Sequence, residues 1–234
     1  KGAVSFLVGR VKQQMKSAPE DASARFADDM RNHPIAAHTA DANVQHYEVP
    51  AAFFRLCLGP RFKYSSCLYK SAADTLVMAE EHALAETCVH AELRDGQDVL
   101  ELGCGWGSMT LWMAARYPNS RITAVSNSAS QRAHIEAEAA RQGLANVRII
   151  TADMNTFDIG EKFDRIVSVE MFEHMSNWRA LLEKCRRWMR PDGRMFMHVF
   201  AHRTAPYRFD VNDPSDWVAH HFFAGGVMPS RDLI

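Results

Sequence analysis

The stretch Asp98-Val-Leu-Glu-Leu-Gly-Cys-Gly-Trp-Gly107 decides the fold of this 234-residue chain. Its first five residues predict a short buried strand, and the three glycines after it predict a tight turn into a helix beginning at Ser108. Open α/β sheets bind ligands at the carboxyl ends of such strands, where the next helix offers unpaired N–H groups. The spacing is G-x-G-x-G rather than the G-x-G-x-x-G of dinucleotide sites, which disfavours NAD and favours another adenosine-bearing cofactor.

Strands and helices alternate on the carboxyl side of this stretch. Ser128-Ala-Ser-Gln131 has the spacing of a capping box for a helix that ends at Gly143, and Pro191-Asp-Gly193 predicts a turn. Further strands are predicted at 121–125, 147–151, 163–169 and 194–200, with helices at 108–117, 128–142 and 178–189. This order predicts a doubly wound, mostly parallel, Rossmann-like sheet. Sheets of this class usually have further strands, and the chain stops at Ile234 in irregular sequence. Either the C-terminal part of the fold is absent from this chain, or one or more strands are not recognised in the sequence.

The chain divides into two parts by composition. Residues 1–45 are polar and rich in alanine, and we predict one or two amphipathic helices that form an N-terminal arm. Residues 46–234 then form the cofactor-binding domain. The chain begins at Lys1 and has no secretory signal pattern, so we expect a trimmed chain.

Composition excludes several classes of protein. The net charge is −1 and no cluster of Lys and Arg occurs, so neither nucleic acid nor a charged membrane surface is an expected partner. No apolar run is long enough to span a bilayer. The five cysteines are scattered without a C-x-x-C pair, which favours a reducing, cytoplasmic setting. Histidine spacings such as His198 and His202 do not fit one metal ion, so no metal is expected.

Glu170-Met-Phe-Glu173-His174 follows the fourth predicted strand on the same edge of the sheet. Three ionisable side chains on one short loop at that edge favour a functional role over a solvated turn. A carboxylate beside an imidazole provides a proton acceptor and a group that orients it. It also provides negative charge for a cationic centre.

Four blocks in this order resemble the S-adenosylmethionine-dependent methyltransferases, in the branch that holds cyclopropane-fatty-acid synthases and coclaurine-type N-methyltransferases. They are 99–107, 125–131, 170–174 and the run Phe222-Phe-Ala-Gly-Gly-Val-Met-Pro-Ser230. The resemblance covers about Asn43 to Ser230 and implies a class I methyltransferase fold with S-adenosylmethionine as cofactor. It departs from methyltransferases at large in lacking an acidic residue at the end of the second strand, within Thr123-Ala-Val-Ser126, as this branch commonly does.

The resemblance implies a set of cofactor contacts. Tyr64 and Ser65 are the pair that closes over the cofactor, and Gly103 and Gly105 lie under its methionine portion. Asn127 and Gln131 lie at the ribose. Asp153 and Met154 flank the adenine, and Val169 lies behind the cofactor.

Two reactions within the branch remain open at this point. A synthase methylates an alkene and removes a proton with bound bicarbonate, and Glu173 and His198 match positions in those enzymes. However, Phe200 stands where synthases usually have Ile, Glu170 where they usually have Gly, and Cys67 is displaced by one residue. The N-methyltransferases share Glu-Met-Phe-Glu-His and the 222–230 run, so the resemblance favours methylation of an amine.

The sequence thus predicts an S-adenosylmethionine-dependent N-methyltransferase that acts on a small aromatic or cyclic amine. Glu170, Glu173 and His174 are the predicted catalytic residues. The predicted substrate residues are His198 and an aromatic wall of Trp217, Phe222 and Phe223. A homodimer is compatible with the sequence, and a cofactor-binding module without catalysis is the third alternative.

Overall fold

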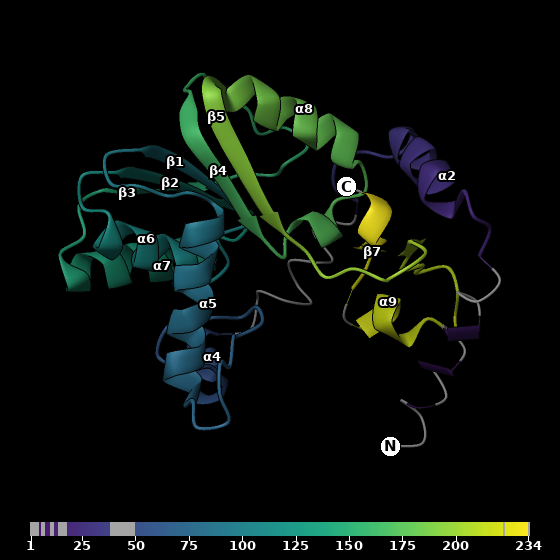
Figure 1. Ribbon diagram of the computed structural model, residues 1–234, viewed down its shortest axis with the longest axis horizontal. Coiled ribbons are helices and arrows are strands. Elements are labelled where there is room, and N and C mark those ends of the chain that lie inside the picture. Colours follow the sequence, from purple (N-terminus) through teal and green to yellow (C-terminus); the bar gives the residue numbers. More distant parts are fainter. Residues whose placement is uncertain are drawn as a thin grey trace.

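Five parallel strands form the central sheet, in the order β3-β2-β1-β4-β5 (Figure 1). They are β1 (Asp98–Leu102), β2 (Arg121–Ser126), β3 (Val147–Thr151), β4 (Phe163–Val169) and β5 (Met189–His198). This computed structural model describes residues 5, 8–9, 12–13, 18–37, 50–221 and 223–233. The doubly wound parallel sheet predicted from the sequence is confirmed.

Helices cover both faces of the sheet. The helices α5 (Leu76–His90), α6 (Ser108–Arg116) and α7 (Ala129–Gln142) lie on one face, and α8 (Trp178–Trp188) lies on the other (Figure 1). Side chains alternate along β1 because a strand has a period of two residues. Val99 therefore packs with Leu84 and Met113 of α5 and α6, whereas Leu100 packs in the cluster that contains Leu181 of α8.

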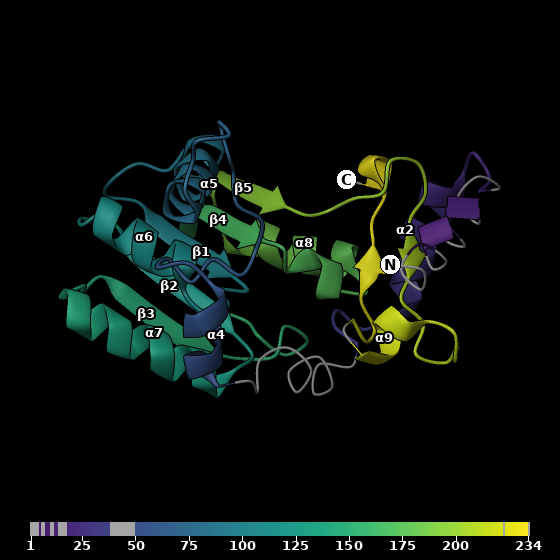
Figure 2. The same cartoon turned by 90° about the horizontal axis from the view of Figure 1, so that it is seen from below.

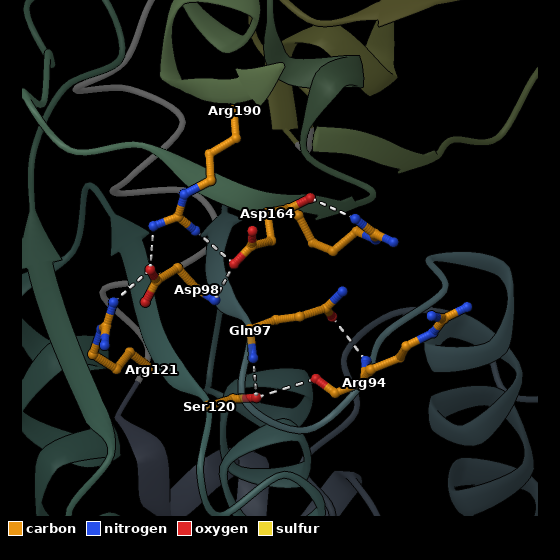
Figure 3. A network of polar contacts seen from close by, with 8 residues as sticks. Arg94, Gln97, Asp98, Ser120, Arg121, Asp164 and Arg190 are labelled. Atoms are coloured by element: carbon orange, nitrogen blue, oxygen red, sulfur yellow. Dashed lines mark hydrogen bonds and ion pairs between the residues drawn. The ribbon is translucent and has the colours of Figure 1, made fainter. Parts of the chain in front are cut away.

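The fifth strand begins earlier than the sequence predicted. We expected a turn at 191–193 and a strand at 194–200, but β5 already pairs with β4 at Met189, with a register irregularity before Arg194, and ends at His198. Arg190 explains the early start, since its guanidinium donates to Asp98 at 2.7 Å and to Asp164 at 2.6 Å (Figure 3). This network joins the starts of three strands at the edge opposite the predicted site.

The predicted cap of α7 forms, but only in part. Ser128 Oγ accepts a bond from the backbone N–H of Gln131 at 3.3 Å, and Gly143 ends the helix with φ +68°. The side chain of Gln131 does not complete the capping box. Its Oε1 instead accepts a bond from Ser126 Oγ at 2.6 Å, at the end of β2. Gln131 is thereby held beside the carboxyl ends of the strands.

Short elements from the two ends of the chain lie next to each other. They are α2 (Ala22–Asp29) and η1 (Met30–Asn32) from the N-terminal part, and β6 (Tyr207–Arg208), α9 (Trp217–His221), β7 (Val227–Met228) and η3 (Arg231–Leu233) from the C-terminal part (Figure 2). Ser23 Oγ lies 2.7 Å from Ser230 Oγ, and β6 and β7 pair as antiparallel strands. The predicted boundary between residues 45 and 46 lies outside the described residues. No helix in the described ranges is long and apolar enough to cross a bilayer.

Candidate functional site

Two adjoining cavities open at the carboxyl ends of β1, β2 and β4. The first, here called the Asn127 cavity, is lined by the ends of β2 and β3 and the start of α7. The second, here called the Tyr64 cavity, has a volume of about 460 Å³ and extends toward the loop before α5. Gly103, Gly105, Glu170 and His174 line both cavities, so these four residues form the border between them.

The glycine loop takes a shape that requires glycine. Gly103 has φ +75° and Gly107 has φ +82°, and a Cβ atom would lie 2.4 Å from Met171 at the first and 2.5 Å from Ile135 at the second. Gly105 has φ +52°, yet a Cβ there would meet nothing within 4 Å. The loop is therefore packed tightly below Gly103 and Gly107, and at Gly105 it leaves open space into which a ligand fits.

The predicted ribose and adenine contacts, Asn127, Gln131, Asp153 and Met154, all line the Asn127 cavity. Their contact with the cofactor stays a prediction. Gln131 is 1% exposed, and its Nε2 is a buried donor without a partner among the described residues. A buried amide donor costs free energy unless a ligand or water satisfies it. This orphan donor and the open face of Gly105 fit a nucleoside-bearing cofactor.

Two alanines of the N-terminal segment also line the Asn127 cavity, and sequence analysis missed them. Ala36 and Ala37 precede a stretch that the structure does not describe, and they carry no chemical signal of their own. Asn155 places them, since its Oδ1 accepts from the Ala36 N–H at 3.0 Å and its Nδ2 donates to the Ala36 carbonyl at 2.9 Å. Only the fold brings these distant residues together.

Three further predicted cofactor contacts, Tyr64, Ser65 and Val169, line the Tyr64 cavity. The Tyr64 ring packs against Phe54 of α4 (Ala51–Cys57), with the two ring centroids 5.3 Å apart. Burial raises the pKa of the Tyr64 hydroxyl. Lys63 and Glu101 line the same cavity and were not predicted from the sequence.

The Glu170 carboxylate faces both cavities from a strained backbone. Its φ is +52°, a left-handed conformation that residues other than glycine rarely adopt. Glu170 Oε1 accepts from Ser66 Oγ at 3.2 Å and lies 3.9 Å from His198 Nδ1. His198 is thus close to Glu170, although it lines neither cavity in the described part of the chain.

Glu173 and His174 occupy different environments, although they are adjacent in η2 (Phe172–His174). His174 faces both cavities, and its ring centroid lies 4.4 Å from that of Phe223. Glu173 is fully buried, and its Oε1 accepts a bond from the Phe200 N–H at 2.8 Å. Its Oε2 has no partner among the described residues, and burial raises the pKa of Glu173 to about 7.

The residues of the predicted aromatic wall lie in different surroundings, and their contact with a substrate stays a prediction. Phe223 lines the Tyr64 cavity together with Phe200, which had not been predicted as a substrate residue. Trp217 lies elsewhere, with 58% of its surface exposed and its ring packed against His221. The short α9 holds Trp217 outside both cavities. The aromatic composition of this stretch does not indicate which of its rings lie at a cavity. Phe222 lies outside the described residues.

No group of three or more His, Cys, Asp or Glu side chains that could hold a metal ion occurs in the described part of the chain. The ionisable groups at the border are the carboxylate of Glu170 and the imidazole of His174. This arrangement can bind a cation and move a proton.

The sheet order and the glycine loop with its adjoining nucleoside cavity define a class I S-adenosylmethionine-dependent methyltransferase fold. The chain belongs to the mycolic acid cyclopropane synthetase family, whose model matches residues 36–234. Its cofactor is S-adenosylmethionine, as the sequence predicted.

Relatives of two kinds resemble the chain. It is 38% identical to (S)-coclaurine N-methyltransferase of Thalictrum flavum subsp. glaucum, over 94% of this chain and 62% of the relative. It is 34% identical to the cyclopropane-fatty-acyl-phospholipid synthase of Escherichia coli K12, over 80% of this chain and 46% of the relative. The chain thus spans about three fifths of the length of the first relative and about half of the second.

A solved structure agrees closely with this chain. It is a coclaurine N-methyltransferase bound to N-methylheliamine and S-adenosylhomocysteine, with a TM-score of 0.89 and 34% sequence identity. The match covers 97% of this chain and 68% of that protein.

Proposed function

We propose that this protein transfers the methyl group of S-adenosylmethionine to the nitrogen of a small aromatic or cyclic amine. The observation that carries the proposal is the position of Glu170, an acidic residue that lines both cavities at their border. The similarity to enzymes named as N-methyltransferases of benzylisoquinoline-type amines supports the same substrate class.

Glu170 supplies the negative charge that an amine site needs. A bound cofactor supplies an electrophilic methyl group, and the chain has to hold a nitrogen beside it. The Glu170 carboxylate attracts a protonated amine, while Phe200 and Phe223 provide aromatic surface on which a flat or cationic ring can pack. Holding the reactants in line accounts for much of the rate in such a transfer.

His174 and Glu173 are proposed to remove the proton from the amine. An amine with a pKa near that of Lys, about 10.4, is protonated at neutral pH and has no lone pair with which to attack. His174 faces the cavities and is the direct acceptor in this proposal. The Glu173 side chain is buried beside it, and its pKa of about 7 allows it to hold or release a proton near neutral pH.

The alternative reaction is methyl transfer to an unsaturated acyl chain. The similarity to the E. coli synthase keeps this alternative open. A third alternative, cofactor binding without catalysis, is disfavoured because acidic and imidazole groups face the cavities. A cytoplasmic location and a homodimer stay predictions.

A methylation assay separates these three alternatives. The protein is incubated with S-adenosylmethionine and a panel of amines, and mass spectrometry detects the gain of one methyl group. The expected result is a methylated cyclic amine, with a yield that does not depend on bicarbonate. Gain of CH₂ on unsaturated phospholipid, stimulated by bicarbonate, would establish the synthase reaction instead, and binding of cofactor without any product would establish the third alternative.

A pH–rate comparison tests the proton step. His174→Ala and Glu173→Gln should lower kcat by about 10²-fold or more at pH 7 and leave cofactor affinity almost unchanged. The deficit should shrink toward pH 9.5, where more amine already carries a free lone pair. Equal deficits at both pH values would show that these side chains position the substrate rather than accept its proton.

A further inference from the structure

Lys63 is a buried cation in the Tyr64 cavity that the proposed reaction does not use. Only 7% of the residue is exposed, and it lines the cavity together with Gly103 and Gly105. Its Nζ donates a hydrogen bond to Ser65 Oγ at 2.5 Å and has no carboxylate within ion-pair distance in the described part of the chain. Burial of an ammonium group is costly unless an anion compensates it, and here it lowers the pKa of Lys63.

The carboxylates near Lys63 are already engaged. Fully buried Glu80 accepts the backbone N–H of Arg61 at 3.1 Å and that of Lys63 at 3.3 Å, so it fixes the loop rather than the ammonium group. Glu170 accepts from Ser66 on the other side of the same loop. The loop is therefore held at two points. Lys63 Nζ donates one hydrogen bond, to Ser65, and has two further hydrogens that it can donate to a ligand.

Charges of both signs line the Tyr64 cavity beside the glycine loop. Lys63 supplies the positive charge, and the hydroxyl of Ser65 still has its own hydrogen to donate. Glu101 and Glu170 supply acidic groups on the same lining, although burial raises the pKa of Glu101 to about 8. A ligand with an ammonium group and a carboxylate complements this arrangement.

We propose that Lys63, together with Ser65, binds the carboxylate of the amino-acid end of S-adenosylmethionine. The glycine loop borders the same cavity, so the methionine portion and Lys63 meet in one space. This inference rests on the cofactor of the family and is independent of the amine proposed as acceptor. Lys63 is then a cofactor-binding residue that selects for an intact amino-acid group.

Calorimetry with two ligands tests the proposal without any acceptor substrate. The ligands are S-adenosylhomocysteine and its decarboxylated analogue, S-adenosyl-3-thiopropylamine. Wild-type protein should bind the intact ligand at least about tenfold more tightly, since a charge-assisted contact is lost in the analogue. Lys63→Met should lose at least about tenfold in affinity for S-adenosylhomocysteine and bind the analogue as wild type does, so that the preference disappears.

Two further variants keep the test decisive. Lys63→Arg retains the charge and should retain a preference for the intact ligand. Arg61→Met removes a cation of the same loop that is exposed and pairs with Glu81 at 2.6 Å, and should change neither affinity. If Lys63→Met weakens both ligands equally, Lys63 only shapes the cavity and the proposal is wrong. Unchanged binding of both ligands would overturn it too, and neither result depends on whether an amine is methylated.

Discussion

At the scale of single residues, the site holds two carboxylates under different kinds of stress. Glu170 has a backbone conformation that costs about 1 kcal/mol or more for a residue with a Cβ atom. Glu173 keeps an acidic group in a fully buried position with one oxygen unpartnered. Both features destabilise the folded protein at the proposed catalytic site, and the effect of each on the free energy of unfolding can be measured.

Glu170→Gly should make the protein more stable and less active. Glycine adopts φ +52° without strain, so the free energy of unfolding should rise by about 1 kcal/mol in a denaturant titration. Methylation of the amine should fall at least about tenfold, because the charge that attracts the amine is gone. Glu170→Gln is the matched control, since it removes the charge, keeps the strain and should not gain stability. A glycine variant with full activity would remove Glu170 from the proposed site.

The free energy of unfolding of the wild type should fall between pH 4.5 and pH 7 because Glu173 is buried, and Glu173→Gln should remove this fall. The pKa of Glu173 is about 7 in the folded state against 4.5 for an ordinary glutamate, so the folded state binds this proton more tightly than the unfolded chain. Wild type therefore has its full stability from this group below pH 4.5 and loses about 3 kcal/mol by the time the pH exceeds 7. Denaturant titrations at pH 4.5 and 8 should show the variant gaining about that amount relative to wild type.

The control for this measurement is Glu183→Gln, which changes an exposed glutamate on α8. Its stability relative to wild type should be the same at both pH values. If the difference in free energy of unfolding between Glu173→Gln and wild type is the same at both pH values, ionisation of Glu173 does not destabilise the folded state.

At the scale of elements, α8 supports the loop that carries the predicted adenine contacts. Lys184 Nζ donates to the carbonyl oxygens of Met154, Asn155 and Phe157 at 2.9, 3.0 and 2.8 Å. One side chain thus satisfies three carbonyl groups of the loop that follows β3. The apolar face of α8 packs on the sheet, and its Lys184 fixes the wall of the Asn127 cavity.

Lys184→Met should loosen this loop and weaken cofactor binding without contacting the cofactor cavity itself. Loss of three partly buried hydrogen bonds should lower the free energy of unfolding by about 2 kcal/mol. The affinity for S-adenosylhomocysteine should fall several-fold, because Met154 then no longer has a fixed position. Arg186→Met, two residues further along α8 and exposed, should change neither quantity. Unaltered affinity in the Lys184 variant would show that the loop holds its shape alone.

At the scale of the whole molecule, the N-terminal segment contributes to the wall of the Asn127 cavity. Ala36 and Ala37 of this segment line the Asn127 cavity. The Ile35 carbonyl accepts the N–H of Ser176 at 2.7 Å, and the Asn155 side chain makes two hydrogen bonds to Ala36. Ile35 and Ala36 are buried in the same core cluster as the sheet residues Leu100 and Val125.

Asn155→Ala should release this segment and reduce cofactor affinity. Hydrogen exchange should accelerate at Ala36, whose N–H loses its acceptor, while amides of β1 and β4 keep their protection. The affinity for S-adenosylhomocysteine should fall by about tenfold, since Ala36 and Ala37 no longer close the cavity. Asn119→Ala is the control, because Asn119 bonds to Asp95 at 2.6 Å on the opposite side of the sheet. Equal exchange at Ala36 in wild type and variant would contradict this role for Asn155.

The sequence predicted the site best where short motifs lie at the ends of strands. Gly103, Gly105, Asn127 and Asp153 lie within three residues of the ends of β1, β2 and β3, and the parallel sheet brings these ends to one edge. The parallel sheet explains why these residues lie together, whereas only the resemblance to methyltransferases pointed to Asn127 and Asp153 as cofactor contacts.

Residues remote from the strand ends could not be placed in this way. Trp217 and Phe223 are only six positions apart, yet one is exposed and the other lines the Tyr64 cavity, because α9 and the loop after it set their directions. Lys63 had no motif of its own beside Tyr64 and Ser65. Burial decides its chemistry, and burial depends on packing.

The sequence by itself determined the alternation of strands and helices, the glycine loop and the order of the charged block after β4. These features are local, since side-chain periodicity and glycine backbone freedom act over a few residues. Only the tertiary structure decided that Ala36 lines the Asn127 cavity, that Glu173 is fully buried and that Lys63 forms no ion pair with the described residues. Those properties depend on contacts between segments far apart in the chain, and the same contacts exclude the water that would otherwise solvate the charges.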